Sequence, residues 1–167
     1  MDHLFSPWRF SYVSNPKEEA ERCVFCRLGS SNPDDDTTNY ILHRGNHHYL
    51  VLNIYPYNPG HLMVVPYEHH ARLGDMEPDA LAELLALTCR VERLLDETYA
   101  PEGINVGLNI GRCAGAGIVD HLHLHAVPRW TGDTSFMTVT GGTRVLPEDL
   151  AESWLKLRRG LEEGTGS

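Results

Sequence analysis

The chain lacks any apolar run near the roughly 20 consecutive residues that a membrane-spanning helix needs, so we expect no membrane partner. Its first residues lack the basic-then-apolar order of a secretory signal peptide, which predicts a cytoplasmic protein. Positive charge is also scarce, since 14 Lys and Arg face 23 Asp and Glu, a formal net charge of −9. This deficit argues against a nucleic-acid partner, but a small phosphorylated ligand bound by backbone N–H groups and histidines is compatible with it.

Cysteine is scarce as well, with four residues in the chain. In a cytoplasmic protein they indicate free thiols or metal ligands rather than disulfides. Cys23 and Cys26 form a Cys-x-x-Cys pair that suits zinc, although a tetrahedral zinc needs two more ligands. His69 and His70, just beyond the third predicted strand, are candidates for one of them. The alternatives are two ordinary thiols in a loop or a redox pair, which the absence of a clear helix start disfavours.

The 167 residues, 41% of them hydrophobic, suffice for one ordinary domain. We expect an N-terminal arm over residues 1–39, whose aromatic side chains dock on the body, a catalytic domain over 40–146, and a C-terminal helix and tail over 147–167. Period-two patterns predict strands over 40–43, 48–53, 61–66, 103–109 and 121–128. Three- and four-residue spacing of apolar residues predicts helices over 78–99 and 147–161. The first three strands suggest an antiparallel meander.

The most informative pattern is His-Leu-His-Leu-His-Ala over residues 121–126. In a strand with this alternation, Leu122, Leu124 and Ala126 bury into the core, and His121, His123 and His125 look outward together. Three crowded imidazoles oppose one another's protonation, so at least one stays neutral near pH 7. A neutral imidazole that is oriented by a hydrogen bond at its other nitrogen is a competent nucleophile toward phosphorus.

Two other interpretations of the three histidines remain open. They can be ligands of a catalytic zinc with an open water position, or simply a solvated edge that binds nickel adventitiously. The loop over residues 111–117 favours the nucleophile, because its glycines and alanines suit close approach of the backbone to an anion. Asn53, at a Pro- and Gly-rich bend, and Asn109, before the glycine loop, either contact a ligand or satisfy local backbone.

Together these motifs resemble the histidine-triad (HIT) superfamily of nucleotide hydrolases and transferases. Its hallmark, His-φ-His-φ-His-φ-φ with φ apolar, matches residues 121–127 at every position. Val51-Leu-Asn53, Pro59-Gly-His-Leu-Met-Val-Val-Pro66, Gly107-Leu-Asn109 and Ala114-Gly-Ala-Gly precede it in the family's order. The bend over 53–61 and the segment after the triad look like the bacterial diadenosine tetraphosphate phosphorylase branch. The resemblance implies an α+β fold, an antiparallel sheet with helices packed on one side, in a homodimer.

The resemblance also implies roles for individual residues. His123 attacks the α-phosphorus and forms a nucleotidyl-histidine intermediate, flanked by His121 and His125. Asn53 contacts the ribose, and His61 occupies a supporting position. The residues implied at the phosphates are Asn109, Gly115, Ala116 and Gly117. A structural zinc is implied at Cys23, Cys26, His69 and His121, and no catalytic cofactor is required.

We therefore expect phosphorolysis of dinucleoside polyphosphates to ADP and ATP, with inorganic phosphate as the second substrate. The alternatives are a HIT-type hydrolase that uses water as the acceptor, a zinc-dependent hydrolase, and a silent nucleotide-binding module. One departure matters, because many family members have a Gln-Ser pair where this chain has Gly117-Ile118. The contacts of the leaving group are thus open, and the room left by Gly117 suggests an entry for phosphate.

Overall fold

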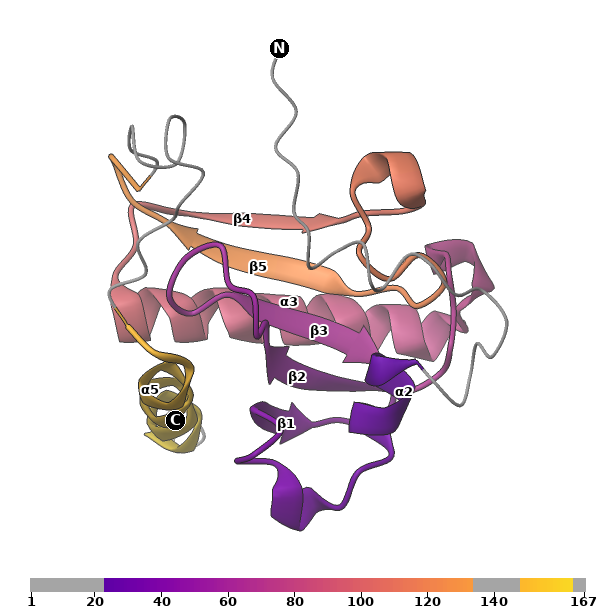
Figure 1. Cartoon of the computed structure of the whole chain (residues 1–167), viewed down its shortest axis with the longest axis horizontal. Coiled ribbons are helices and arrows are strands. Elements are labelled where there is room, and N and C mark those ends of the chain that lie inside the picture. Colours follow the sequence, from indigo (N-terminus) through magenta and orange to yellow (C-terminus); the bar gives the residue numbers. More distant parts are fainter. Residues whose placement is uncertain (1–22, 134–147, 164–167) are drawn as a thin grey trace.

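The computed structural model describes residues 23–133 and 148–163, which form an antiparallel sheet with helices packed against it (Figure 1). The strands are β1 (Ile41–Arg44), β2 (His48–Leu52), β3 (Leu62–Pro66), β4 (Gly103–Leu108) and β5 (Leu124–Arg129). The helices are α2 (Val24–Gly29), α3 (Pro78–Tyr99) and α5 (Leu150–Glu163), joined by the 3-10 turns η1 (Pro33–Asp35), η2 (Leu73–Asp75) and η3 (Arg112–Ala114). The expected docking of residues 1–22 and the polar tail 164–167 lie outside the described residues.

The strand order is β1-β2-β3-β5-β4, with every neighbouring pair antiparallel. The predicted meander is therefore confirmed for β1 to β3, after which β5 returns beside β3 and leaves β4 at the edge. The predicted strands and helices recur within a few residues of the expected ends. In the described part of the chain, no helix is both long enough and apolar enough to cross a membrane.

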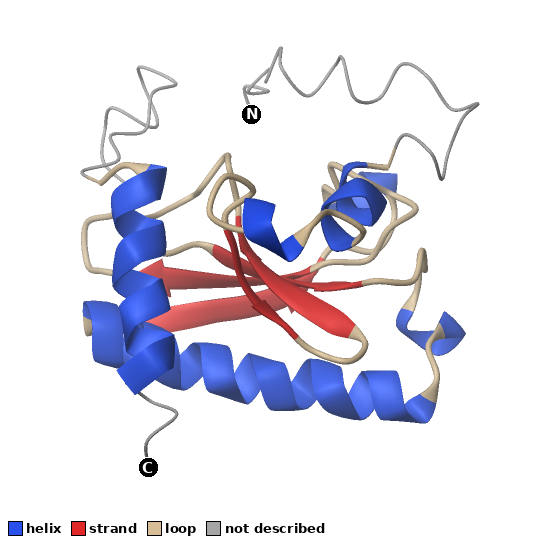
Figure 2. Cartoon of the chain, turned by 90° about the horizontal axis from the view of Figure 1, so that it is seen from below, coloured by secondary structure: helices blue, strands red, loops and turns tan. Residues whose placement is uncertain are grey.

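The two faces of the sheet contact different helices. Leu50, Leu62 and Leu124 on one face pack with leucines of α3 and α5. On the other face Tyr49 and Met63 belong to a second cluster, which includes Cys23 and Phe25 at the start of α2. Because successive side chains of a strand point to opposite faces, each face of the sheet contributes to its own hydrophobic core. Both long helices lie on the same side, with α3 running beneath the strands (Figure 2), which confirms the predicted α+β class.

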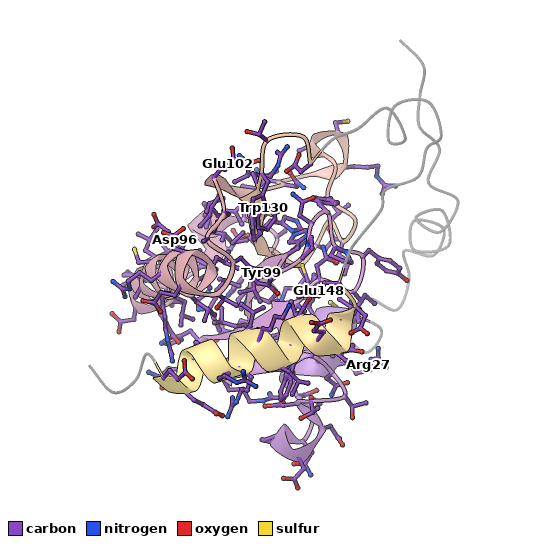
Figure 3. The ribbon with its side chains drawn as sticks, turned by 90° about the vertical axis from the view of Figure 1, so that its left-hand side faces the viewer. Arg27, Asp96, Tyr99, Glu102, Trp130 and Glu148 are labelled. Carbon is purple, nitrogen blue, oxygen red and sulfur yellow. The ribbon has the colours of Figure 1, made fainter. Side chains whose placement is uncertain are left out.

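Helix α5 crosses one end of α3, as Figure 2 shows. A Cβ at Gly160 would lie 2.8 Å from a methyl carbon of Leu94, so the glycine permits this close approach. The hydroxyl of Tyr99, in the last turn of α3, donates to Glu148 just before α5 (2.6 Å), and Ser153 of α5 donates to the same carboxylate (2.6 Å). Figure 3 shows Tyr99 and Glu148 between the two helices.

Candidate active site

Within the triad, the third histidine alone lies in a strand. β5 begins at Leu124, so His125 is a strand residue, and His121 and His123 precede it in an irregular segment. The expectation that all three imidazoles look outward together is wrong, because His121 is fully buried and His123 is only 6% exposed. The burial of Leu122, Leu124 and Ala126 on the core side is confirmed.

The late start of β5 has a local cause. Pairing with β3 ends at Val64–Leu124 and pairing with β4 ends at Leu108–Leu124, so residues 121–123 precede the paired part of the sheet on both sides. The N–H of Leu122 instead donates to the carbonyl oxygen of His70 (2.6 Å), in the chain that follows β3. The ring of His121 then lies against Phe25 of α2, with ring centroids 5.4 Å apart.

The ring of His123 is oriented by a backbone hydrogen bond. Its Nδ1–H donates to the carbonyl oxygen of His121 (2.9 Å), which leaves Nε2 without a proton in the neutral ring. The ring of Phe25 packs against it, with centroids 4.9 Å apart. Burial lowers the pKa of His123, although the backbone hydrogen bond acts in the opposite direction. A buried neutral imidazole with a lone pair at Nε2 is what nucleophilic attack on phosphorus requires.

A chain of hydrogen bonds sets the tautomer of His125. The N–H of Tyr57 donates to Nδ1 of the fully buried His61 (3.1 Å), so neutral His61 carries its proton on Nε2. That N–H donates to Nδ1 of His125 (2.9 Å), so neutral His125 carries its proton on Nε2 in turn. His123 and His125 therefore differ at Nε2, where the first has a lone pair and the second an N–H.

The side chain of Asn53, just after β2, makes local contacts. Its Oδ1 accepts the N–H of Tyr55 (2.9 Å), and its Nδ2 lies 3.5 Å from Nδ1 of His61. Local backbone bonding was one of the two interpretations of this residue, and the structure shows that bond. The contact of Asn53 with a ribose stays a prediction. The side chain is half-buried beside His61, so it is still accessible to a ligand.

The glycine loop between β4 and β5 presents its backbone to open space. Gly111 and Gly115 have φ angles of 89° and 90°, in the left-handed region that favours glycine. A Cβ added at Gly115 or Gly117 would meet no heavy atom within 4 Å, whereas Ala116 between them is buried. No side chain therefore obstructs an anion at these glycines, although the N–H of Gly115 already donates to the carbonyl oxygen of Arg112 (3.1 Å).

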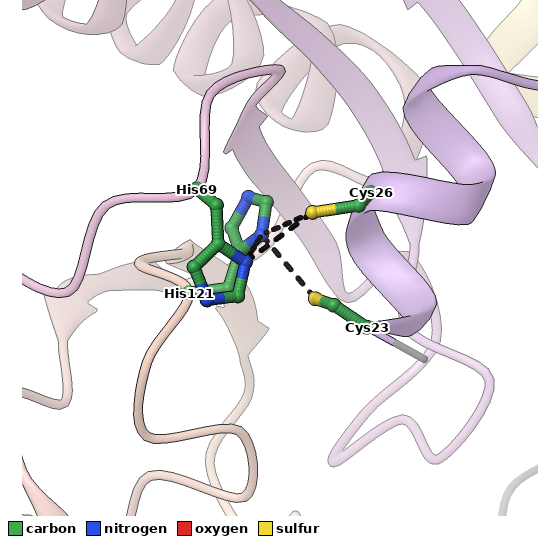
Figure 4. Close-up of side chains that lie close together, drawn as sticks. All are labelled: Cys23, Cys26, His69 and His121. Atoms are coloured by element: carbon green, nitrogen blue, oxygen red, sulfur yellow. Dashed lines mark hydrogen bonds between the residues drawn. The ribbon is translucent and has the colours of Figure 1, made fainter. Parts of the chain in front are cut away.

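The four predicted metal ligands converge on one point (Figure 4). Nδ1 of His121 lies 3.3 Å from Sγ of Cys23, 3.4 Å from Sγ of Cys26 and 3.2 Å from Nδ1 of His69. All four ligand atoms lie within 4.8 Å of one another. Zn–N bonds of ~2.0 Å and Zn–S bonds of ~2.3 Å give a tetrahedron with edges of roughly 3.3–3.8 Å. The donor set and its spacing thus suit zinc. His70 instead bonds Glu68 (2.8 Å).

The surroundings of the cluster also suit a metal. The Nε2–H of His121 donates to the carbonyl oxygen of Pro66 (2.9 Å), which leaves Nδ1 to face the cysteines. Burial lowers the pKa of His121 to about 4, against the bond to Pro66 and helped by the neighbouring His69. Burial and the neighbouring Cys23 raise the pKa of Cys26 to about 11. The metal-free thiol of Cys26 is therefore protonated, and a metal that binds there displaces the proton.

Two side chains anchor α2 to the sheet. The buried hydroxyl of Tyr49 donates to the carbonyl oxygen of Phe25 (2.8 Å). The guanidinium of Arg44 donates to the carbonyl oxygen of Gly29 at the end of the helix (2.8 Å), and Asp36 holds that guanidinium (2.7 Å). These contacts fix α2, which contains Cys26 and begins directly after Cys23, so the expectation that no helix starts at the Cys-x-x-Cys pair is wrong.

A cavity of about 310 Å³ opens beside His125, on the sheet face that β4 and β5 share. The lining side chains that concern the chemistry are Tyr57, Asn105, Asn109, Val127 and Arg129. Gly107, directly opposite His125 in the strand register, forms part of the floor.

Sequence reasoning missed two features of the site. Phe25 packs on both His121 and His123, and its place between two predicted cysteine ligands was the available signal. The buried Asn58 donates to the carbonyl oxygen of Pro128 and to Asp133 (2.7 Å each), which ties the bend over 53–61 to the end of β5. No local pattern reveals this tie, because the partners are 70 and 75 positions away.

The fold and the three histidines define a class of protein. The model of the HIT domain family matches residues 36–132, more than half of the chain, so the chain belongs to the HIT domain family.

Particular relatives are similar over most of the chain. An AP-4-A phosphorylase of Mycobacterium tuberculosis is 39% identical over 160 residues, which cover 92% of this chain and 80% of that protein. A Zn-bound histidine triad family protein of Mycobacterium smegmatis superposes with a TM-score of 0.69 and 31% identity, over 87% of this chain and 97% of its own. An asymmetrical bis(5'-nucleosyl)-tetraphosphatase of Schizosaccharomyces pombe is 32% identical over 84 residues, 50% of this chain and 46% of that protein.

Proposed function

We propose that the protein is a nucleotidyltransferase that phosphorolyses dinucleoside polyphosphates such as diadenosine tetraphosphate to ADP and ATP. The observation that carries the proposal is His123, a buried ring whose Nδ1 is fixed on the carbonyl oxygen of His121 and whose Nε2 has a lone pair. The similarity to the M. tuberculosis AP-4-A phosphorylase supports this class of substrate.

The reaction has two displacements at the same phosphorus. First, Nε2 of His123 attacks the α-phosphorus, so a P–N bond forms and the P–O bond to the leaving ATP breaks. The Nε2–H of His125 donates a hydrogen bond to the leaving oxygen, and His61 keeps His125 in that tautomer. An oxygen of inorganic phosphate then attacks, the P–N bond breaks, and ADP leaves. Dividing the transfer in this way replaces one difficult step by two easier ones.

Other residues bind the substrate in this scheme. We assign the ribose to Asn53 and the phosphates to Asn109 and to the backbone of Gly115, Ala116 and Gly117. The open space above Gly115 and Gly117 supports the second assignment. Backbone N–H groups that point at a phosphoryl group stabilise the negative charge on its oxygens during transfer.

We also propose that Cys23, Cys26, His69 and His121 hold a structural zinc. The spacing of their ligand atoms supports this, and so does the Zn-bound relative from M. smegmatis. The metal would supply a cross-link between α2, the chain after β3 and the triad. No catalytic cofactor is needed, because the nucleophile and the hydrogen-bond donor are both histidines.

The assembly and location form a further part of the proposal. β4 is an edge strand, and Val106 and Ile110 on and beyond it are 48% and 40% exposed. We propose a homodimer that pairs through this edge. None of the four cysteines forms a disulfide, which supports a reducing, cytoplasmic location. Residues 1–39 are assigned to an arm that carries the cysteines, 40–146 to the catalytic domain, and 147–167 to its C-terminal helix and tail.

The test is incubation with diadenosine tetraphosphate, with and without inorganic phosphate, followed by identification of products. We expect ADP and ATP only when phosphate is present, and an acid-labile adenylyl adduct at His123 after rapid quenching. The hydrolase is the second candidate, favoured by the similarity to the S. pombe tetraphosphatase. AMP and ATP in equal amounts, with no dependence on phosphate, would replace the phosphorylase by that hydrolase.

A further inference from the structure

One hydrogen bond alone does not determine where Nε2 of His123 points. The Nδ1–H of this ring donates to the carbonyl oxygen of His121 (2.9 Å), and the bond sets the tautomer. A carbonyl oxygen accepts hydrogen bonds over a broad range of directions, so the ring can tilt about this bond. Attack on phosphorus needs a nitrogen that is both close and aligned. A second contact must therefore limit the tilt of the ring.

The ring of Phe25 supplies this second contact. Its centroid lies 4.9 Å from that of His123, with the ring planes at 45°. Both side chains are buried, with 5% of Phe25 and 6% of His123 exposed. Since protein interiors are close-packed and hardly compressible, a tilt of the imidazole toward Phe25 would make the two rings overlap. The phenyl ring thus stops the movement of His123 on that side.

Phe25 is itself held in place. Its carbonyl oxygen accepts the hydroxyl of Tyr49 (2.8 Å), which ties its backbone to β2. Its side chain belongs to the buried cluster that includes Ile41 of β1 and Met63 of β3. The ring therefore has contacts with the sheet that do not involve the triad.

The same ring also contacts the residue that orients His123. Phe25 and His121 have ring centroids 5.4 Å apart, with the planes at 63°. Because His121 provides the carbonyl oxygen of the Nδ1–H bond, one phenyl ring borders both partners of that bond. Phe25 therefore limits the movement of the donor residue and of the acceptor residue.

We propose that Phe25 is a positioning residue for adenylyl transfer, whose ring keeps Nε2 of His123 aimed at the α-phosphorus. In this role it acts through His123 rather than on the substrate. The inference rests on the proposed function, because it takes His123 as the nucleophile. Loss of the ring should lower the rate of the first displacement and leave substrate binding nearly unchanged.

Phe25→Leu tests the inference, because it removes the ring and keeps an apolar side chain. Formation of the adenylyl adduct from diadenosine tetraphosphate is followed by rapid quenching in a single turnover. We expect the maximum rate constant to fall about 10- to 100-fold, since misplacement of a reacting group by ~1 Å has an effect of this size. The substrate concentration at half the maximum rate should change less than about twofold. Phe25→Met, with a flexible side chain that fills irregular gaps, should recover part of the rate.

A spectroscopic measurement reports on the imidazole itself. Heteronuclear NMR of isotope-labelled histidine distinguishes a proton on Nδ1 from a proton on Nε2. We expect neutral His123 of the wild type to carry its proton on Nδ1 alone. Phe25→Leu should show a mixture of both tautomers, because a ring that tilts loses the bond to His121.

Ile41→Ala is the matched control. Ile41 belongs to the same buried cluster as Phe25, but it lies on β1, which β2 and β3 separate from β5. The substitution removes as many carbon atoms as Phe25→Leu and should lower Tm. The rate of adduct formation and the tautomer of His123 should stay as in wild type. Zinc content, measured with a chromogenic chelator, should be the same in wild type and in all three variants.

Formation of the adduct at the wild-type rate in Phe25→Leu would overturn the positioning role, and so would an equal slowing in Ile41→Ala. A loss of zinc that parallels the loss of rate would overturn it too, because the effect would then pass through the cysteine–histidine cluster. These outcomes concern the variants. A wild-type protein that forms no adenylyl adduct would instead overturn the proposed function.

Discussion

At the residue scale, His121 belongs to two neighbouring sites, the cysteine–histidine cluster and the triad. Its ring belongs to the cysteine–histidine cluster, and its carbonyl oxygen orients the ring of His123. A substitution of His121 is therefore expected to affect both the proposed zinc site and the proposed nucleophile. Changes that separate the two effects must be made at His123 or at the cysteines.

Replacement of His123 by Asn is expected to abolish the adenylyl adduct. Because the covalent route needs Nε2, turnover of diadenosine tetraphosphate should fall at least about 1,000-fold. Quenched reactions with radiolabelled substrate measure the adduct. His47→Asn, at an exposed histidine, is the control and should behave as wild type. Persistent turnover in His123→Asn would exclude the nucleophile proposed here.

His48 is a buried histidine outside the active site. Its side chain is fully buried in β2, and neither ring nitrogen has a hydrogen-bond partner among the described residues. Burial lowers the pKa of His48, opposed by the nearby Glu83 and helped by His47. We predict that His48→Leu raises the free energy of unfolding at pH 7 by about 1–3 kcal/mol, because it removes two unsatisfied polar atoms. Denaturant unfolding measures this.

The pH dependence of His48→Leu has a definite sign. A pKa lowered by folding contributes stability that is fully present above the unfolded value of about 6.5 and is lost as the pH falls through the folded value. The advantage of His48→Leu over wild type should therefore grow between about pH 7 and pH 5. The exposed His47→Leu is the control, and a constant difference across this range would contradict the prediction.

At the scale of elements, α2 depends on its neighbours. A helix of six residues is too short to be stable alone, so its place is set by Tyr49, Arg44 and the metal cluster. The contacts of Arg44 reach the last turn of α2, where carbonyl oxygens lack helical partners.

Arg44→Lys should therefore weaken zinc binding although it touches no ligand atom. A lysine keeps the charge but cannot join Asp36 and Gly29 at once with a planar fork. We expect an affinity about tenfold lower, measured by competition with a chromogenic chelator. Arg27→Lys, on the exposed side of the same helix, should leave the affinity unchanged. An equal loss in both variants would contradict the specific role of Arg44.

The sequence predicted most elements because period-two and period-3.6 patterns report locally which face is buried. The predicted start of β5 was wrong because the alternation of the triad extends to residues before Leu124, where pairing with both β3 and β4 ends. The Cys-x-x-Cys spacing indicated a metal but left His69 and His70 equivalent. The fold separates them, because His69 joins the cluster and His70 bonds Glu68. Ligands 43 to 98 positions apart are brought together by tertiary contacts alone.

At the scale of the whole molecule, the cysteine–histidine cluster brings together segments that the sheet does not connect. It holds the start of the described chain against residues that follow β3 and precede β5. Binding free energy released there is folding free energy, since the ligands are not assembled in the unfolded chain.

Removal of zinc by a chelator under reducing conditions should lower Tm by about 10 °C, measured by thermal melting. The initial rate at temperatures well below that Tm should fall less than about threefold, because no step uses the metal as a Lewis acid. Cys23→Ser should have the lowered Tm with or without chelator. In the exposed Cys89→Ser, the chelator should lower Tm by as much as in wild type. Complete loss of activity at an unchanged Tm would identify a catalytic metal.

The segments near the triad differ in packing. Phe25 and the cysteine–histidine cluster are held by buried contacts, whereas a Cβ added at Gly111, Gly115 or Gly117 in the loop over 111–117 would meet no heavy atom within 4 Å. If His123 is the nucleophile, we expect adjustment to different substrates to occur in this loop, because the buried contacts around Phe25 leave the imidazole little room to move.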